Sequence, residues 1–282
     1  MNLNLKDITF IVVTYKSDNI IQKCLNTLPS ESQKIIVENS NNINLKKDLK
    51  AKYDNIEVIL SQNIGMGPGN NLGIKSCKTK YAFILNPDTQ FKPDTLDNLI
   101  NSLTKVQDFT IASPLNDNPE LPNYKKLSSN QDIDNNILSV DRVDGFSMLL
   151  NLNNFSDKNY FDENIFLYLE NDDLCLRVKK KEQKIYLITN SLIYHKGSIS
   201  NNIELEYLRN WHWMWSKFYF NKKHYGFINA FSKIFFNLLS AILKYLINLV
   251  IFNKHKKQIY KMRILGILNS VFGKKSFYRI DN

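Results

Sequence analysis

Short hydrophobic runs alternate with amphipathic segments through the first part of the chain. The runs at 8–14, 34–38, 56–60 and 81–85 are continuous and rich in β-branched residues, a pattern typical of strands covered on both faces. A fifth run follows at 109–112. Helices are expected between the runs at 20–28, 45–52, 63–73 and 93–105. This alternation predicts an α/β fold in which a mostly parallel sheet has helices on both faces.

Polar and small residues follow the predicted strands where each strand ends. In parallel sheets, ligands bind beyond the carboxyl ends of the strands, so we expect the functional site along this edge. The candidate residues there are Thr14, Tyr15, Glu38, Asn39, Asn63, Gly65, Asn86 and Asp88.

The second half of the chain has a less regular pattern. A polar stretch at 116–136, with several Asp, Asn and Pro residues, is expected to form a long loop. We expect a strand at 143–150 and a helix that begins within the acidic segment 161–177. Two short strands are expected at 185–188 and 192–194.

The net charge of +10 is concentrated at the C-terminal end of the 282-residue chain. Residues 221–282 contain 12 Lys or Arg and one acidic residue, whereas residues 1–220 contain 25 Lys or Arg and 26 Asp or Glu. This split predicts a neutral globular domain over 1–220 and a basic region over 221–282 that seeks an anionic surface. Nucleic acid is disfavoured as a partner, because the basic residues lie beside large apolar faces and the sequence has no nucleic-acid-binding motif.

Cysteine usage and the N-terminal sequence indicate the compartment. Cys24, Cys77 and Cys175 are too few and too scattered for a disulfide framework or a zinc site, so we expect reduced, buried thiols. The chain starts almost at once with a strand-like run and shows no secretory leader. We therefore expect a cytoplasmic location.

Three groups of side chains are candidates for catalysis. Asn-Pro-Asp at 86–88 is either an ordinary turn or a carboxylate held at a strand end for a divalent cation, which prefers oxygen ligands. Glu170, Asp172 and Asp173 lie within four residues, where like charges repel unless a helix N-terminus, a cation or a proton-transfer site compensates. His195 ends a strand and suits a metal or a diphosphate, although a lone histidine is more often structural.

The glycine-rich stretch at 63–73 resembles a dinucleotide-binding fingerprint only weakly. Its third glycine is not at the proper offset, and the stretch does not follow the first strand. Its backbone is nevertheless suited to approach a phosphate or a base at the start of a helix.

These motifs occur in a defined order between about Thr9 and about Tyr225. They are VVTY (12–15), VENSN (37–41), NIGMGPGNNLG (63–73), LNPD (85–88), VDGFSMLL (143–150), FDENIFLYLENDDLCLR (161–177) and IYHKGSIS (193–200). The set resembles the family 2 glycosyltransferases of the GT-A fold, in the rhamnosyltransferase-like branch where Asn-Pro-Asp replaces Asp-x-Asp. Each motif is modest alone, but together in this order they are specific.

The resemblance implies a nucleotide-sugar site along the expected edge. Thr14 and Tyr15 would border the nucleotide, Glu38 would read the base, and Asn71 would lie near the donor. The residues implied to bind the nucleotide-sugar are Thr14, Tyr15, Glu38, Asn63, Gly65, Asn71, Asn86 and Asp88.

The resemblance also implies a single inverting displacement assisted by Mg²⁺ or Mn²⁺. Asp88 would hold the cation against the diphosphate, with His195 as the second protein ligand. Asp144 and Gly145 would line the cleft between donor and acceptor. A carboxylate would take the proton from the acceptor hydroxyl that attacks the anomeric carbon.

The sequence departs from the family pattern in two places. Where many relatives have Glu-Asp-x-Asp, this chain has Asn171 at the position usually called the base, and an amide cannot accept a proton usefully. The base is therefore expected among Glu170, Asp172 and Asp173, with Glu170 favoured and Asp172 next. Glu38 stands where Asp is commoner, which leaves the nucleotide base open.

The longest apolar segment, 231–252, has the spacing of an amphipathic helix. Its polar residues Lys233, Asn237, Lys244 and Asn248 fall on one stripe, and a spanning helix would place Lys244 near the bilayer centre at about 3 kcal/mol. An interfacial helix avoids this cost. The residues expected to enter lipid are Phe231, Ile234, Phe235, Leu239, Ile242, Leu246 and Ile247.

Basic and aromatic residues beside this segment point to the same surface. Lys254, Lys256, Lys257, Lys261 and Arg263 would meet anionic head groups, so the region 231–263 is expected to bind an anionic membrane. The aromatic run 211–220 is expected at the same interface. The alternative is that these helices pack only on the protein or on a second subunit.

We therefore expect an enzyme that is peripheral on the inner face of a bacterial cell membrane. It would transfer one sugar, with rhamnose the most familiar choice, from a dTDP- or UDP-linked donor to a lipid-linked or surface-polysaccharide glycan. Capsule and lipopolysaccharide pathways fit this role, and a homo-oligomer stays open. Two alternatives are an inactive relative that binds sugar-nucleotide or glycan as a module, and a membrane-bound scaffold with a vestigial site.

Overall fold

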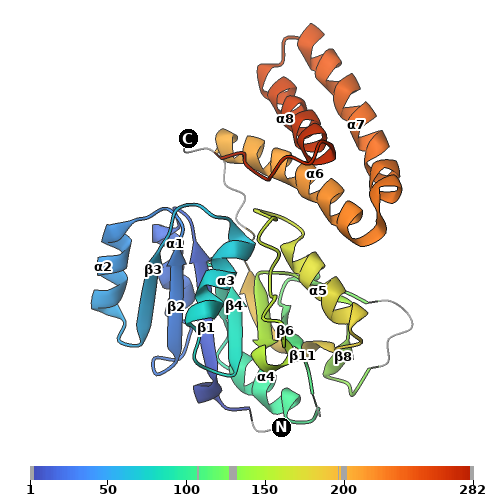
Figure 1. Cartoon of the computed structure of the whole chain (residues 1–282). Helices are drawn as coiled ribbons and strands as arrows, with labels where there is room; N and C mark the ends of the chain where they lie inside the picture. The colour runs from blue at the N-terminus through green and yellow to red at the C-terminus, as the bar shows by residue number, and fades with distance from the viewer. Residues whose placement is uncertain (1–2, 107, 127–131, 196, 198–201, 280–282) are drawn as a thin grey trace. The chain divides into compact units, whose positions relative to one another are not determined.

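The computed structural model describes residues 3–279 except 107, 127–131, 196 and 198–201 (Figure 1). The chain forms two compact units. We call Met1–Asp162 with Asn171–Ser198 the sheet unit, and Glu163–Glu170 with Ile199–Asn282 the helical unit. The units therefore divide at 198/199, whereas the sequence predicted a boundary at 220/221, because the long helix that begins at Ile203 packs with the helices after it.

The first half of the sheet is parallel, as the sequence predicted. Its strand order is β3-β2-β1-β4, and all three pairings are parallel. The strands are β1 (Ile8–Thr14), β2 (Gln33–Glu38), β3 (Ile56–Leu60) and β4 (Tyr81–Leu85). All four point their carboxyl ends toward the same edge, which we call the carboxyl edge.

The second half of the sheet is mixed. β10 (Ser147–Asn151) lies antiparallel between β4 and β6 (Ile111–Asn116), and the order continues through β11 (Ile185–His195) to β5 (Thr89–Phe91). β11 is parallel to β6 and antiparallel to β5. The two short strands expected at 185–188 and 192–194 are one strand with an irregular register between Ile188 and Leu192.

Smaller elements complete this unit. β8 (Ile137–Ser139) pairs with β11, and β7 (Tyr124–Lys125) pairs with β9 (Arg142–Val143) in a separate two-stranded sheet. Two 3-10 turns are η1 (Leu5–Asp7) and η2 (Leu152–Asn154). The stretch expected as a long loop at 116–136 thus contains one short strand, and its residues 127–131 lie outside the described part of the chain.

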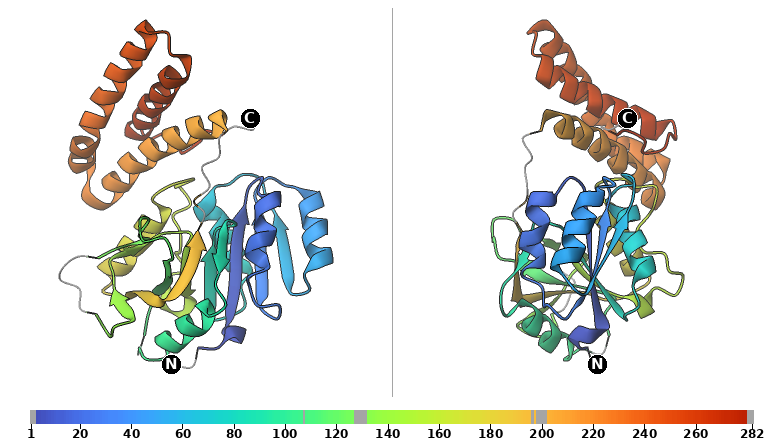
Figure 2. Two further views of the ribbon diagram at one scale, coloured as in Figure 1. Left: turned by 180° about the vertical axis from the view of Figure 1, so that it is seen from behind. Right: turned by 90° about the vertical axis from the view of Figure 1, so that its left-hand side faces the viewer.

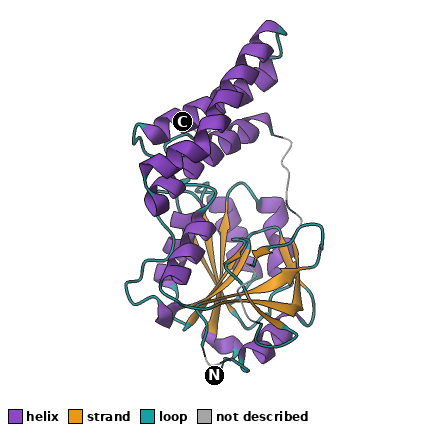
Figure 3. Ribbon diagram, turned by 90° about the vertical axis from the view of Figure 1, so that its right-hand side faces the viewer, coloured by secondary structure: helices purple, strands orange, loops and turns teal. Residues whose placement is uncertain are grey.

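Helices cover both faces of the sheet (Figures 2 and 3). Alternate β1 side chains face opposite layers: Phe10 and Val12 belong to one hydrophobic core, and Ile11 and Val13 to the other. The first core is covered by α1 (Asp18–Leu25), α2 (Ile43–Lys52) and α4 (Thr95–Leu103). The second is covered by α3 (Met66–Ser76) and α5 (Glu170–Lys180).

Glycines in α3 let this helix approach β1 closely. A Cβ at Gly69 would lie 2.9 Å from Val13 Cγ1, and one at Gly73 would clash with Ile11 Cγ2. The glycines of the 63–73 stretch thus serve helix–strand packing, in addition to any approach to a ligand by the backbone at its start.

The helical unit contains α6 (Ile203–Tyr225), α7 (Phe227–Val250) and α8 (Lys254–Val271). Its core combines Met214 and Phe218 from α6, Ile234 from α7 and Ile267 from α8. Ile234, which the sequence placed in lipid, therefore faces the protein. Two tryptophans of the aromatic run expected at a membrane, Trp211 and Trp215, are likewise buried here.

The C-terminal segment is fastened to α6 through a buried histidine. The His212 Nε2–H donates to the Tyr278 carbonyl at 2.8 Å, and Nδ1 lies 2.9 Å from the Ser276 hydroxyl. Burial, together with the nearby positive charge of Arg279, lowers the pKa of His212 to about 3, although the bond to Tyr278 opposes this shift. His212 is therefore neutral in the folded protein near pH 7.

This histidine should make the helical unit sensitive to acid. The pKa of His212 rises to its ordinary value near 6.5 on unfolding, so the unfolded chain binds one more proton between about pH 6.5 and 3. The stabilisation is complete above that window and is lost as the pH falls through it. Denaturant unfolding followed from pH 7 to 4 should show a smaller loss of unfolding free energy for His212→Gln than for the unchanged protein. Equal losses would contradict this account.

Candidate active site

The turn after β4 and the end of β11 bring Asp88 and His195 together. β5 is antiparallel to β11 with Thr89 opposite His195, so Asp88 immediately precedes the paired position. Asp88 Oδ1 and His195 Nε2 are 3.4 Å apart, and 11% and 20% of the two side chains are exposed. The Phe146 ring stacks on the His195 imidazole, with 4.0 Å between ring centroids. The pair is thus held in place and still reached by solvent.

The backbone fixes the Asn-Pro-Asp turn that carries Asp88. The Asn86 N–H donates to the Phe146 carbonyl at 2.9 Å, and the Thr89 hydroxyl donates to the Asn86 carbonyl at 2.7 Å. The turn is therefore tied both to the start of β10 and to β5. The Asn-Pro-Asp sequence thus forms an ordinary turn and also holds the Asp88 carboxylate in a defined position.

Asp144 and Gly145 lie in a turn that interrupts the strand predicted at 143–150. β9 ends at Val143 and β10 begins only at Ser147. The Asp144 N–H donates to the Asn123 carbonyl at 2.8 Å. The backbone between β9 and β10 thus forms its hydrogen bond with a loop residue outside the named strands.

Arg142 joins two carboxylates of this region. Its guanidinium lies 2.8 Å from Asp172 Oδ1 and 3.3 Å from Asp144 Oδ1. The sequence did not single out Arg142, and its only signal is a position just ahead of the VDG motif. Because only 34% of Arg142, 38% of Asp144 and 19% of Asp172 is exposed, the attraction between these charges is less screened than on an open surface.

Asp144 is electrostatically linked to both sides of the site. Partial burial raises the pKa of Asp144 above its ordinary value and the negative charge of Asp172 raises it further, whereas Arg142 and His195 lower it. The pKa of Asp144 therefore depends on the charges of both His195 and Asp172. Perturbed carboxylates of this kind are typical of functional sites.

Asp173 has a structural role in place of the predicted catalytic one. Its side chain is fully buried, and Arg177 Nε donates to it at 2.8 Å. The same guanidinium donates to the carbonyls of Asn159 and Tyr160. An acceptor hydroxyl cannot reach this carboxylate, since a buried ion pair and a packed loop cover it.

Glu170 is the first residue of α5 and follows a strained stretch of backbone. Tyr168 and Leu169 both have positive φ, 70° and 68°, which for residues other than glycine costs of order 1–3 kcal/mol each. Within the helical unit Tyr168 packs edge-on against Trp213, and the Ser216 hydroxyl donates to the Leu167 carbonyl at 2.8 Å. The division of the chain places Glu170 with the helical unit and residues 171–173 with the sheet unit.

Asn171 holds the turn that carries Asp144. Its Nδ2 donates to the Val143 carbonyl at 3.0 Å. A Cβ at Gly145 would lie 3.3 Å from the Asn171 Cβ, a tight contact. The amide at the position usually called the base is thus a positioning group, and a carboxylate in its place could not donate to this carbonyl.

The ends of β1 and β2 and the start of α3 form one connected set of loops. The Asn39 N–H donates to the Thr14 carbonyl at 2.8 Å, and Asn39 Nδ2 donates to the Gly65 carbonyl at 3.0 Å. Gly65 has φ 102°, a left-handed conformation that favours glycine. The predicted residues Thr14, Tyr15, Asn63 and Gly65 therefore share the carboxyl edge, although Thr14 is fully buried.

The side chains of Glu38 and Asn71 both form hydrogen bonds with nearby loops. The buried Glu38 carboxylate accepts hydrogen bonds from the Ser40 N–H at 3.1 Å, the Ser40 hydroxyl and the Asn42 N–H, so it folds its own loop. Asn71 exchanges two hydrogen bonds with the Phe161 backbone, at 2.8 and 3.0 Å. Both side chains fix loops beside the site instead of presenting free groups to a base or a sugar.

The family of the chain follows from comparison with known proteins. The model of the family named Glycosyl transferase family 2 matches residues 9–164, more than half of the chain. The chain belongs to glycosyl transferase family 2. The match spans β1 to β10 and so includes the Asp88 turn, Arg142 and Asp144.

Two curated proteins are similar to this family 2 glycosyltransferase at low identity. One is the low-salt glycan biosynthesis hexosyltransferase Agl10 of Haloferax volcanii, 24% identical over 200 residues. That alignment covers 64% of this chain and 64% of Agl10, slightly less than two thirds of its length. The other is the rhamnosyltransferase WbbL of Escherichia coli, 23% identical over 240 residues, covering 72% of this chain and 88% of WbbL.

Solved structures show that the fold is GT-A. The mannosyltransferase PcManGT from Pyrobaculum calidifontis, in complex with GDP-Man and Mn²⁺, superposes with a TM-score of 0.59 at 10% identity, over 95% of this chain and 88% of that one. GalNAc-T7 with UDP, GalNAc and Mn²⁺ superposes with a TM-score of 0.55 at 10% identity, over 85% and 58%. The predicted fold class, including the C-terminal helical extension, is confirmed.

The side chains of this transferase supply two candidate metal ligands at the carboxyl edge. In the parts of the chain that the structure describes, no group of three or more His, Cys, Asp or Glu side chains could hold a metal ion. Asp88 and His195 form a pair at the carboxyl edge with suitable donor atoms and separation. Of the motif at 193–200, Lys196 and residues 198–200 lie outside the described residues.

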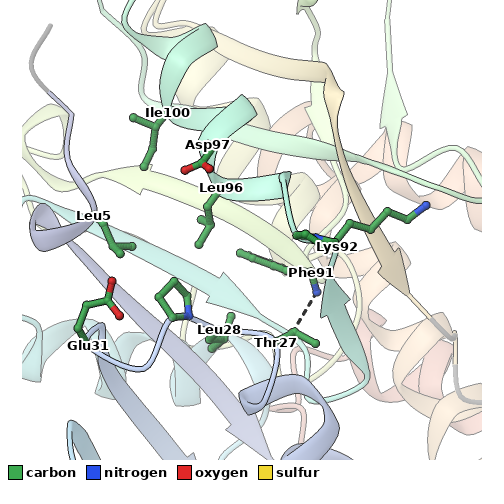
Figure 4. A pocket seen from close by; sticks show the side chains of 11 residues that line it. Leu5, Thr27, Leu28, Glu31, Phe91, Lys92, Leu96, Asp97 and Ile100 are labelled. Carbon is green, nitrogen blue, oxygen red and sulfur yellow. Dashed lines mark hydrogen bonds between the residues drawn. The ribbon is translucent and has the colours of Figure 1, made fainter.

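A separate hollow lies away from the carboxyl edge (Figure 4). It has a volume of about 520 Å³, and its lining includes Leu5 before β1, Leu28 after α1, and Leu96 and Ile100 of α4. Leu5 precedes the amino end of β1, whereas Asp88 and His195 follow the carboxyl ends of β4 and β11. We therefore assign the site to the carboxyl edge on the basis of its chemistry.

Converting Asn171 to aspartate should weaken the protein. In Asn171→Asp the bond to the Val143 carbonyl is lost and a carboxylate faces that carbonyl, which should lower the unfolding free energy by about 1–3 kcal/mol. Guanidinium unfolding at neutral pH measures this loss. Asn118→Asp is the matched control, because Asn118 only accepts, through Oδ1, from the Glu120 N–H. Equal stability of the two variants would show that the amide does not hold the turn.

Proposed function

We propose that this protein transfers one sugar from a nucleoside-diphosphate sugar to a hydroxyl group of a glycan acceptor, with inversion and with the help of a divalent cation. The observation that carries the proposal is the Asp88–His195 pair, placed at the carboxyl edge of a family 2 glycosyltransferase chain. Asp144 and Asp172 supply carboxylates for an acceptor hydroxyl. The loops after β1 and β2 and before α3 offer backbone N–H and C=O groups for a nucleotide.

The donor atoms of Asp88 and His195 fit a shared cation. Carboxylate oxygen and imidazole nitrogen are ordinary ligands of Mn²⁺ and Mg²⁺, and two atoms bound to one ion at about 2.1 Å lie about 3 Å apart. The observed separation of 3.4 Å is close to that value. The PcManGT and GalNAc-T7 structures both contain Mn²⁺. When bound, such a cation would neutralise the charge of the departing diphosphate.

The structure favours Asp172 over Glu170 as the group that takes the acceptor proton. Asp172 belongs to the same unit as Asp88 and His195 and is linked to them through Arg142 and Asp144. The arginine holds Asp144 and Asp172 at two fixed points, so that one carboxylate can bind an acceptor hydroxyl while the other accepts its proton. Glu170, the residue favoured from sequence, stays the second candidate.

The relatives suggest the class of donor and acceptor. One is a hexosyltransferase of glycan biosynthesis and the other a rhamnosyltransferase, which supports a hexose or deoxyhexose donor. We take dTDP or UDP as the carrier of that sugar. A growing surface glycan on a lipid-linked or polysaccharide carrier, at the inner face of the cell membrane, is the corresponding acceptor. Each of these choices is part of the proposal.

Asp88→Asn should abolish transfer with little effect on stability. Sugar transfer from dTDP- and UDP-sugars with added Mn²⁺ should fall by roughly a hundredfold or more, because the cation loses its carboxylate. The melting temperature without ligand should change little, since Asp88 lies at the edge of the sheet. The rise in melting temperature given by nucleoside diphosphate plus Mn²⁺ should disappear.

Asp97→Asn, on the exposed face of α4, is the matched control and should behave like the unchanged protein. Full transfer by Asp88→Asn would contradict the proposal. An unchanged protein that binds the nucleotide with Mn²⁺ but transfers no sugar from any of these donors would favour an inactive binding module.

The same assay separates the candidate bases. Asp172→Asn should lower kcat by roughly 10²–10⁴-fold while the nucleotide-dependent thermal shift persists, because the donor site is intact. Glu170→Gln should have a smaller effect. Loss of transfer in Glu170→Gln together with normal transfer in Asp172→Asn would reverse the assignment.

A further inference from the structure

α7 exposes a broad apolar face that none of the described residues of the helical unit covers. The helix is long and apolar enough to cross a membrane, yet only 17% of its most apolar window is buried. Phe236 and Val250 are 75% and 73% exposed. The other large apolar side chains that α7 exposes are Phe227, Ile228, Phe231, Phe235, Leu239, Ile242, Leu243, Leu246, Ile247 and Leu249.

The exposed apolar residues occupy one continuous arc of the helix. α7 is buried along a narrow seam of Ala230, Ile234, Ala241 and Asn248, which recur at the spacing of one helix face. At 100° per residue, the arc from Phe231 round to Ile247 covers about 160° and contains two polar residues, Ser232 and, at its edge, Asn229. We call this arc the α7 face.

Basic residues border the α7 face. Lys233 and Lys244 fall between the arc and the buried seam, and the Lys244 ammonium lies 5.7 Å from the centre of the Tyr260 ring in α8. Arg263 lies 5.8 Å from the same ring. α7 and α8 contain no acidic residue, and the α8 sequence begins KHKKQIYK. One edge of the apolar face therefore carries lysines, and neither α7 nor α8 places a negative charge beside it.

The packing of the unit argues against a helix that crosses the bilayer. Lys217 of α6 donates to Asn237 of α7 at 3.0 Å, and Lys244 of α7 meets Tyr260 of α8, so α7 has charged neighbours well inside its length. A crossing would draw these charges into hydrocarbon, which is strongly unfavourable. An orientation in the plane of the membrane buries the apolar arc and leaves the charged edge in water.

We propose that the helical unit docks on the surface of an anionic phospholipid bilayer, with α7 lying in the membrane plane. The α7 face enters the acyl region, and the lysines at its edge meet phosphate head groups. A shallow groove of about 370 Å³, lined by Phe227, Phe231, Phe235 and Phe236 among others, offers an apolar surface for acyl chains. The charge of the border selects lipid over a second copy of the chain, because two such borders would repel each other.

Vesicle co-sedimentation of the full chain tests this proposal. The protein should bind vesicles that contain phosphatidylglycerol at least about tenfold more tightly than vesicles of phosphatidylcholine alone, and salt should weaken that preference. The triple variant Phe236→Ser, Leu243→Ser, Val250→Ser should bind at least about tenfold less to both. Ile43→Ser with Leu121→Ser, two exposed apolar residues of the sheet unit, is the matched control and should bind normally.

Three results would overturn the proposal. They are equal binding by the α7 variant and the control, resistance of bound protein to alkaline carbonate extraction (which marks a spanning helix), and a lipid-free dimer that the α7 variant dissociates. Nucleotide-dependent thermal shifts of the α7 variant should match those of the unchanged protein. Failure of lipid binding would therefore leave the proposed transferase function untouched. Failure of sugar transfer would likewise leave the proposed membrane docking untouched.

Discussion

The antiparallel pairing of β5 with β11 is the constraint on which the site depends. It places Thr89 opposite His195 and so sets Asp88 beside the imidazole, although the two residues come from distant parts of the sequence. The pair is further fixed by Phe146, which stacks on His195 and whose carbonyl accepts from the Asn86 N–H. A three-residue strand thus decides whether the two proposed metal ligands meet.

A second group of charged side chains is coupled electrostatically to this pair through His195. Arg142 forms ion pairs with both Asp144 and Asp172, and the charge of His195 helps to lower the pKa of Asp144. Asn171 supports the same turn with a hydrogen bond that only an amide can donate. The region therefore combines the pair proposed to bind a cation with carboxylates that differ in environment, as the proposed proton transfer from a glycan hydroxyl requires.

The sequence predicted those parts that local patterns determine. β1, β3 and β4 have the predicted limits, because continuous β-branched runs mark strands buried on both faces. β5 is too short to leave a pattern. β11 was expected as two strands because the polar residues 189–191 separate its apolar runs. Its register is irregular at this point, opposite Pro114, a residue without an N–H to donate. The partners of Asp173 and Glu38 are close in the sequence, namely Arg177 one helical turn later and the 40–42 loop. What the sequence did not reveal is the complete burial of these two carboxylates, which depends on the tertiary packing around them.

Mn²⁺ binding followed by electron paramagnetic resonance tests the central pairing most directly. Adding the protein together with UDP or dTDP to a Mn²⁺ solution should remove the signal of the free ion far more than either component alone. His195→Ala, which leaves the Asp88 turn in place, should restore most of that signal. Undiminished Mn²⁺ binding by His195→Ala would contradict a shared site, because the imidazole would then contribute nothing to holding the cation.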